Sequence, residues 1–155
     1  MISKTCKYGL RAAIYLAIRN YYEVISIQKI SQDLNIPFHF LTKTLQRLTR
    51  NKILVSTKGP KGGVRLAKPP QNITSMEVIL AIDGSDIFEI CLLGLPGCGV
   101  LNPCPLHDSW TQTLENLKKS LNTTTLEFLA EKVKNNQLRI TETNSPEFLN
   151  DLIKS

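Results

Sequence analysis

The sequence predicts a mainly α-helical protein that carries one small β-hairpin. Apolar residues recur at intervals of three and four through residues 8–18, 27–34 and 38–50, which is the one-face spacing of amphipathic helices. Two β-prone runs then flank a stretch rich in glycine and lysine, as in a hairpin. Helical spacing returns in the second half of the chain. With 155 residues, 42% of them hydrophobic, the chain can bury one compact core.

The first two predicted helices are short and pack inward. The apolar residues of the first share one face: Leu10, Ala13, Ile14, Ala17 and Ile18. Ser26 is placed to cap a second helix over Ile27 to Leu34. This helix is expected to end near Asn35, because Pro37 disfavours helical geometry in the residue before it.

The third predicted helix has one apolar and one polar, basic face. The apolar face holds Phe38, Leu41, Leu45 and Leu48. The opposite face holds His39, Lys43, Gln46 and Arg50, with Thr42 beside them. Such side chains contact phosphates and base edges, and the DNA major groove admits one α-helix. The second and third helices therefore predict a helix-turn-helix.

A hairpin is predicted next, with strands over Ile53–Thr57 and Val64–Ala67. Its glycines allow the backbone to approach a phosphate closely, and Lys58, Lys61 and Arg65 would follow the DNA backbone or enter the minor groove. The loop could instead hold a nucleotide phosphate. Against this, GPKGG lacks the Walker spacing and leads into a strand rather than a helix.

A fourth helix is predicted to complete the domain. Thr74 and Glu77 form a capping-box pair at its start, and Asp83-Gly84 ends it. Residues 1–83 thus read as a winged helix-turn-helix DNA-binding domain.

Charge is divided unevenly along the chain. Residues 1–68 hold 13 Lys and Arg against 2 Asp and Glu, a net +11, and residues 69–155 hold 6 against 11, a net −5, consistent with the +6 of the whole chain. A basic first half favours a polyanion such as double-stranded DNA as partner. A solvated surface without a partner is the alternative.

The sequence favours a cytoplasmic location without a membrane partner. It contains no apolar run of about 18 residues, and its start, MISKTCKYGLRAA, places charges where a signal peptide needs apolar residues. Cysteines in a reducing compartment are more often free thiols or metal ligands than disulfides.

Residues 84–106 are predicted to form a loop that carries Cys91, Cys98 and Cys104, separated by six and five residues. Iron in iron–sulfur clusters prefers thiolates, and a loop rich in glycine and proline can wrap around a cluster. Zinc is the competing ligand: the gaps fit zinc knuckles poorly, but three thiolates and a histidine are a legitimate zinc set. Unliganded thiols remain a third alternative. His107 is the candidate fourth ligand, against a role as a solvent-exposed residue at a helix start.

A long helix and a short helix that folds back onto the core are expected over residues 107–135, and a tail over residues 136–155. Trp110, Leu114, Leu117 and Leu121 form a seam of coiled-coil type on the long helix. One apolar seam on an exposed helix requires a partner, which predicts a dimerisation helix.

Three segments together resemble the winged-helix regulators of the IscR, NsrR and CymR family. They are KYGLRAAIYLA, GPKGGVRLAKPPQNITSMEVILAIDG and the cysteine triad, and the resemblance covers about residues 1–130. It implies a homodimer whose long helix crosses the partner and, in cluster-bearing members, an iron–sulfur cluster that controls DNA affinity. Some relatives instead respond without a cluster, through a protein partner or thiol oxidation.

The resemblance also bears on the fourth ligand. The spacing of Cys104 and His107 matches the ending seen in the 2Fe–2S assembly regulator, which nominates His107 and favours a 2Fe–2S over a 4Fe–4S centre. Other relatives take an acidic ligand from the first helix of the second subunit, where this chain has Lys7, beside Cys6. A cluster of this kind is often lost during purification.

The expected function is a DNA-binding transcriptional regulator, not an enzyme, whose DNA affinity is controlled by a redox-sensing cluster in the 91–107 loop. The first alternative is a clusterless winged-helix regulator controlled by a protein partner or thiol oxidation. The second is a small electron carrier or redox enzyme. Against it, the sequence has no second cysteine group, no nucleotide fingerprint and no paired nucleophile and base.

Overall fold

The computed structural model describes residues 2–136, 138–142 and 146–154. Its elements are α1 (Lys4–Ile18), α2 (Ile27–Leu34), α3 (Phe38–Arg50), β1 (Leu54–Thr57), β2 (Gly63–Leu66), the 3-10 turns η1 (Pro70–Asn72) and η2 (Asp86–Phe88), α4 (Ser75–Asp83), α5 (His107–Thr123), α6 (Leu126–Asn136) and α7 (Pro146–Lys154). The prediction of a mainly α-helical chain with one antiparallel hairpin is confirmed.

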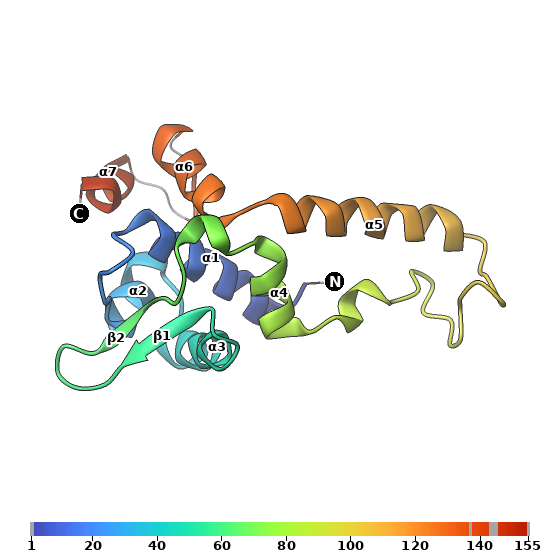
Figure 1. Ribbon diagram of the computed structural model, residues 1–155, viewed down its shortest axis with the longest axis horizontal. Coiled ribbons are helices and arrows are strands. Elements are labelled where there is room, and N and C mark those ends of the chain that lie inside the picture. The colour runs from blue at the N-terminus through green and yellow to red at the C-terminus, as the bar shows by residue number, and fades with distance from the viewer. Residues whose placement is uncertain (1, 137, 143–145, 155) are drawn as a thin grey trace.

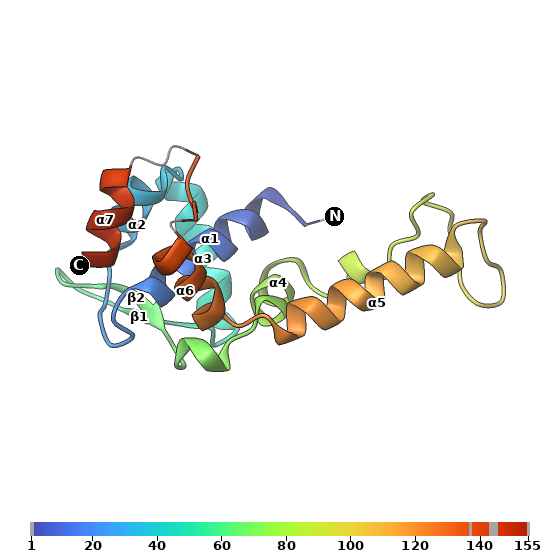
Figure 2. The same cartoon turned by 90° about the horizontal axis from the view of Figure 1, so that it is seen from above.

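The molecule divides into a head and an arm (Figures 1 and 2). The head gathers α1 to α4, the hairpin, α6 and α7. The arm consists of residues 84–123, in which α5 extends away from the head and the segment before it runs out to the far end of the helix. The arm thus carries its loop at the point most distant from the hairpin.

The core of the head is built around α1, which packs against α3, α4 and α6. Gly9 sets the distance between α1 and α4: a Cβ at this position would lie 2.2 Å from Ile82 Cδ1 and 3.1 Å from Thr44 Cγ2. A larger residue at this position would require the Ile82 side chain to shift. The largest fully buried side chains are Tyr15, Ile30, Leu34, Ile36, Leu41, Leu45, Leu48, Leu54, Leu66, Ile73, Ile79 and Leu126.

Side-chain caps fix the helix starts, largely as predicted. The Ser26 Oγ accepts a hydrogen bond from the Lys29 N–H, and Thr74 and Glu77 form the complete capping box. Helix α1 begins earlier than the apolar spacing predicts, at Lys4, because the Ser3 Oγ accepts from the Cys6 N–H. Asp83 at the end of α4 in turn accepts from the Ser3 N–H, at 2.7 Å.

The hairpin pairs Leu54 with Leu66 and Thr57 with Gly63. Its base is tied to the segment before α2, because Ile25 and Val64 exchange two backbone hydrogen bonds of 3.0 and 2.9 Å. A Cβ on Gly63 would lie 2.1 Å from the Ile25 carbonyl oxygen, so this pairing also requires glycine. The wing is thereby positioned beside α2 and α3.

The junction of α5 and α6 is bound to the start of α4. The Ser75 N–H donates to the Thr124 carbonyl at 2.8 Å, and the Leu126 N–H donates to the Ile73 carbonyl at 2.9 Å. These bonds attach the inner end of α5 to the head.

The structure differs from the expected burial at two apolar residues. Phe38, expected on the apolar face of the third helix, is 45% exposed. Leu114, expected in a seam facing a partner, is buried in the chain's own core, where α5 packs on α4. Helical spacing identifies a face but not what covers it, so these differences could not be read from the periodicity.

The tail is more closely attached than its composition indicates. Ile140 and Leu152 are buried, and the Arg11 Nε donates to the Ile140 carbonyl at 2.6 Å. Parts of the predicted tail, residues 137, 143–145 and 155, lie outside the described residues.

Candidate nucleic-acid interface and metal centre

The polar stripe of α3, formed by His39, Lys43, Gln46 and Arg50, is exposed along its whole length. Thr42 beside it is half-buried, and its hydroxyl donates to the Phe38 carbonyl at 2.8 Å, which leaves the oxygen free to accept. The predicted residues of this helix therefore do share one accessible face.

Helix α3 is held to the end of α4 by two side chains. Arg47 Nη1 donates to the Ile82 carbonyl at 3.2 Å, and Asn51 Nδ2 donates to the Ala81 carbonyl at 3.1 Å. Both satisfy carbonyls that a helix end leaves without partners. The orientation of the polar stripe thus depends on where α4 ends.

The three predicted wing cations are not alike. Lys58 and Lys61 are exposed at the hairpin tip. Arg65 is half-buried at its base, where Nη1 donates to the Leu66 carbonyl at 3.0 Å and the guanidinium lies 5.8 Å from the centre of the Tyr21 ring. Contact of Arg65 with DNA remains a prediction and requires this side chain to extend from Tyr21.

Two cations near this surface are paired with carboxylates of the chain. Lys29 pairs with Asp33 at 3.1 Å, and Lys68 pairs with Glu77 at 2.9 Å. Burial alone would raise the pKa of Glu77, but hydrogen bonds from Lys68 and from the Thr74 N–H outweigh it and lower that pKa. Among the described residues, Lys43, Arg50, Lys58 and Lys61 have no such partner. The polar stripe and the wing tip therefore form a surface of uncompensated positive charge, which attracts phosphates.

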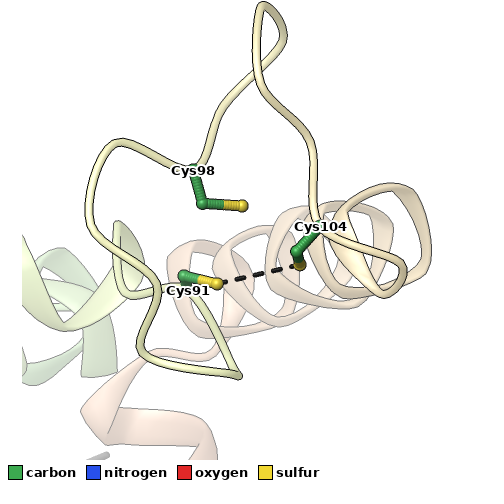
Figure 3. Close-up of side chains that lie close together, drawn as sticks. All are labelled: Cys91, Cys98 and Cys104. Atoms are coloured by element: carbon green, nitrogen blue, oxygen red, sulfur yellow. Dashed lines mark hydrogen bonds between the residues drawn. The ribbon is translucent and has the colours of Figure 1, made fainter.

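The three loop cysteines converge beside the start of α5 (Figure 3). Their sulfur atoms all lie within 4.8 Å of one another, and the Cys91 and Cys104 sulfurs are 3.7 Å apart. Residues separated by up to thirteen positions meet because the chain turns sharply twice, at Gly94 and Gly97, where φ is +67° and +68°. Glycine adopts such angles at little cost.

Backbone groups of the loop also point at sulfur. The N–H groups of Leu95 and Leu93 hydrogen-bond to Cys91 and lower the pKa of its thiol to about 7. The N–H of Cys104 acts on Cys98 in the same direction, but burial and the neighbouring thiols outweigh it, and the pKa of Cys98 is raised. The loop thus stabilises one thiolate readily, and a second negative charge beside it requires a cation.

His107 belongs to this cluster. It is the first residue of α5, and its Nδ1 lies 3.6 Å from the Cys98 sulfur. Sequence spacing placed His107 beside Cys104, but a helix starting at His107 turns its ring toward Cys98. The structure therefore brings the three cysteines together and places His107 at the edge of their cluster, beside Cys98.

The cluster's dimensions bear on what it can hold. Thiolates around one tetrahedral ion with metal–sulfur bonds of about 2.3 Å are about 3.8 Å apart, near the 3.7 Å between Cys91 and Cys104. A cluster with several irons is larger and requires the sulfurs to separate, which an exposed loop with two glycine turns permits. The donor set, three thiols and an imidazole with N–H groups aimed at sulfur, suits iron–sulfur as well as zinc.

Cys6 is a different kind of thiol. It is completely buried in the head, and burial, followed by the negative charge of Asp83, raises its pKa to about 12. Such a thiol is neither ionised nor accessible, so Cys6 is a core residue here. Lys7 beside it is exposed.

The loop is tied to its helix by Trp110, whose Nε1 donates to the Ile90 carbonyl at 2.8 Å. Composition did not indicate this bond, nor the N–H groups of Leu93 and Leu95, since backbone donors carry no signal in the sequence. No helix within the described parts of the chain has the length and apolar character that crossing a membrane demands.

Comparison with known proteins shows which family and which structures this chain is similar to. The profile of the Rrf2 family, described as an iron-dependent transcriptional regulator, matches residues 2–132. A putative HTH-type transcriptional regulator from Aquifex aeolicus is 32% identical over 131 residues, which cover 83% of this chain and 90% of that protein. The HTH-type transcriptional regulator IscR from Yersinia pseudotuberculosis is 30% identical over 120 residues, covering 77% and 73%. Among solved structures, the global cysteine regulator CymR of B. subtilis superposes with a TM-score of 0.73 at 27% identity, covering 84% of this chain and 96% of CymR.

Proposed function

Since the chain belongs to the Rrf2 family and is a transcriptional regulator rather than an enzyme, we propose that it binds DNA as a homodimer under the control of an iron–sulfur cluster in its arm. The observation that carries the proposal is the convergence of three thiols within 4.8 Å on a loop of the arm, away from the charged surface of the head.

The DNA-binding part of the proposal rests on the polar stripe of α3 and the wing tip. In this arrangement α3 enters the major groove with His39, Thr42, Lys43 and Gln46 facing base edges, and Arg50 near the backbone. Lys58 and Lys61 lie along the neighbouring phosphates or in the minor groove, with Arg65 behind them.

The homodimer is supported by apolar surface on the arm. Leu117 on α5 is 38% exposed, and the loop exposes Leu92, Leu93, Leu95, Val100 and Leu101, the last two almost completely. Exposed apolar side chains in this number on one part of a chain indicate an interface. We assign it to a second copy, because a helix that projects from the head presents the same surface on both copies and so permits twofold pairing.

The metal-binding part assigns Cys91, Cys98 and Cys104 as thiolate ligands and His107 as the fourth ligand of a 2Fe–2S centre. When bound, such a centre supplies iron that is sensitive to oxygen and to reduction. The N–H groups of Leu93 and Leu95 stabilise thiolate charge at Cys91. His107 binds as a neutral imidazole with its Nδ1 directed at the site.

A continuous series of contacts connects the cysteine loop to the DNA-binding helix. The loop is bonded to α5 through Trp110, α5 packs on α4, and α4 receives Arg47 and Asn51 from α3. A change in the ligands of the loop therefore alters contacts of the helix that leads to the DNA-binding surface.

The test is anaerobic purification or reconstitution, with iron, acid-labile sulfide and zinc measured on the same sample. The proposal expects coloured protein with iron and sulfide in equal amounts, and DNA affinity that changes when the cluster is removed. His107→Ala should retain a centre with an altered spectrum and a shorter lifetime in air.

Two results would contradict the proposal. Colourless reduced protein with one zinc per chain would favour a structural zinc site, the second candidate, which the 3.7 Å separation of Cys91 and Cys104 supports. Colourless protein without metal would favour control by a protein partner or by thiol oxidation. An unchanged spectrum and lifetime in His107→Ala would remove only this residue from the ligand set.

A further inference from the structure

Phe38 occupies an unusual place on the charged surface of the head. It is the first residue of α3, directly before the polar stripe, and its side chain is 45% exposed. Its ring meets the His39 ring edge to face, with centroids 5.9 Å apart. A single exposed apolar residue is ordinary on a protein surface. Its surroundings, however, show that this ring is part of a shaped surface.

Two hollows of the surface share the Phe38 ring as a wall. The first lies toward α2 and is otherwise lined by Gln28, Ser31 and Gln32. The second lies toward the wing and is lined by Ile27, Gln28, Ser56, Thr57, Gly59, Gly62 and Gly63. Phe38 thus forms an apolar ridge between two recesses that are lined by residues of α2, α3 and the hairpin.

The lining of both hollows is uncharged. Lys58 and Lys61, exposed and without a carboxylate partner among the described residues, neighbour the wing glycines in the sequence, and Lys43 lies on the same helix as Phe38. An apolar side chain on a surface that carries exposed cations complements a polyanion that offers an apolar group. In the DNA major groove, only the C5-methyl group of thymine answers that description.

We propose that Phe38 reads thymine, by packing its ring on the C5-methyl group of a T·A pair in the major groove. The inference rests on the proposed function, in which α3 enters that groove, and adds a residue that selects sequence. The first residues of a reading helix approach the base edges most closely, which suits a residue at its N-terminus. Burying one methyl group favours thymine by about fourfold over the same base without it.

The experiment isolates that methyl group. Duplexes are enriched from a random pool on the full-length protein, and each thymine of the enriched site is then replaced singly by deoxyuridine, which lacks only the C5-methyl. Dissociation constants are measured by fluorescence anisotropy at one salt concentration. We expect one thymine in each half-site whose replacement weakens binding about fourfold.

The variants Phe38→Ala and Phe38→Leu test the assignment. Phe38→Ala should bind more weakly and no longer distinguish thymine from deoxyuridine at that position, and Phe38→Leu should keep part of the distinction. Phe40→Ala is the matched control: Phe40 is 63% exposed on the same helix turn but lines neither hollow. It should distinguish the two bases as the wild type does. Thermal melting of each variant verifies folding.

The outcomes separate this inference from the function on which it rests. Failure to enrich any duplex would overturn DNA binding, and the role of Phe38 with it. Two results would overturn the role of Phe38 alone. In the first, no deoxyuridine replacement changes the affinity for the enriched site. In the second, both Phe38 variants still prefer thymine to deoxyuridine. Equal loss of the preference in Phe40→Ala would show a general effect of removing an aromatic ring and would likewise overturn it.

Discussion

The head buries most of its large apolar residues, whereas the arm leaves several of its own exposed. In the head, α1 is surrounded by α3, α4 and α6, and residues such as Tyr15, Leu41 and Leu45 are at most 1% exposed. In the arm, Val100 and Leu101 are 89% and 100% exposed. The head therefore has an apolar core of its own, whereas the proposed metal and second copy would cover apolar residues that the arm leaves exposed.

The largest effect expected from this difference concerns cysteine. Cys98→Ala should abolish stable metal binding while leaving the melting temperature of the apo-protein unchanged, because its side chain supports no core contact. Cys6→Ala should do the reverse and retain metal while lowering the melting temperature, because Cys6 is completely buried. Metal analysis and calorimetry on both variants measure this. Loss of metal in Cys6→Ala would place that residue in the metal centre.

The next effect concerns two leucines of α5. Leu117→Asp should convert dimers to monomers, with affinity reduced more than about a hundredfold, because twofold pairing brings two buried charges together at a cost of several kcal/mol. Leu114→Asp should instead destabilise the monomer, since Leu114 packs in the chain's own core. Sedimentation and chemical unfolding distinguish the two variants. A Leu117→Asp protein that still sediments as a dimer would locate the interface elsewhere.

A smaller effect on stability is expected from replacing one glycine in the head and one in the arm. Gly9→Ala should destabilise the head by about 1 kcal/mol, because the new Cβ overlaps the end of the buried Ile82 side chain, which must shift against its neighbours. Gly99→Ala in the arm should be neutral, since nothing lies within 4 Å of a Cβ there. Urea unfolding monitored by circular dichroism provides the comparison. Equal stabilities would mean that α1 and α4 are less tightly packed than the structure shows.

The smallest effect concerns phosphate contacts. Lys43→Ala should weaken DNA binding severalfold and lower the slope of log K against log salt concentration by about one unit, because one counterion fewer is released. Lys119→Ala, on the exposed surface of α5, serves as the charge-matched control and should change neither quantity. Unchanged affinity of Lys43→Ala at low salt would contradict the assignment of the polar stripe.

Much of the head could be predicted from its sequence because its signals are local. Ser26 and the pair Thr74 and Glu77 cap helices wherever they occur before an apolar run, and both caps are present. The errors concern what covers a face. Phe38 follows the apolar spacing of α3 yet is 45% exposed, and Leu114 follows a seam of coiled-coil type yet is buried in the chain's own core.

The candidate metal centre was predictable by residue type and not by geometry. Cysteine is a strong signal, and all three loop cysteines do meet. Which sulfur His107 approaches depends on the path of the loop before α5, and the spacing of Cys104 and His107 did not indicate that the ring lies beside Cys98.

The attachment of α5 by its inner end makes the helix a lever. Its 17 residues span about 25 Å, from the junction bonded to Ile73 and Ser75 out to His107 at the tip. A tilt of about 10° about that pivot would carry the tip through about 4 Å, the scale of a ligand bond replaced or lost at the cysteines. In the opposite sense, a displacement of about 4 Å at the tip turns the pivot by about 10°. If two heads are each fixed to such a helix, rotations of this size would change the distance between the heads. Because the major groove repeats with each helical turn of DNA, that change would decide whether both polar stripes can enter the groove at the same time.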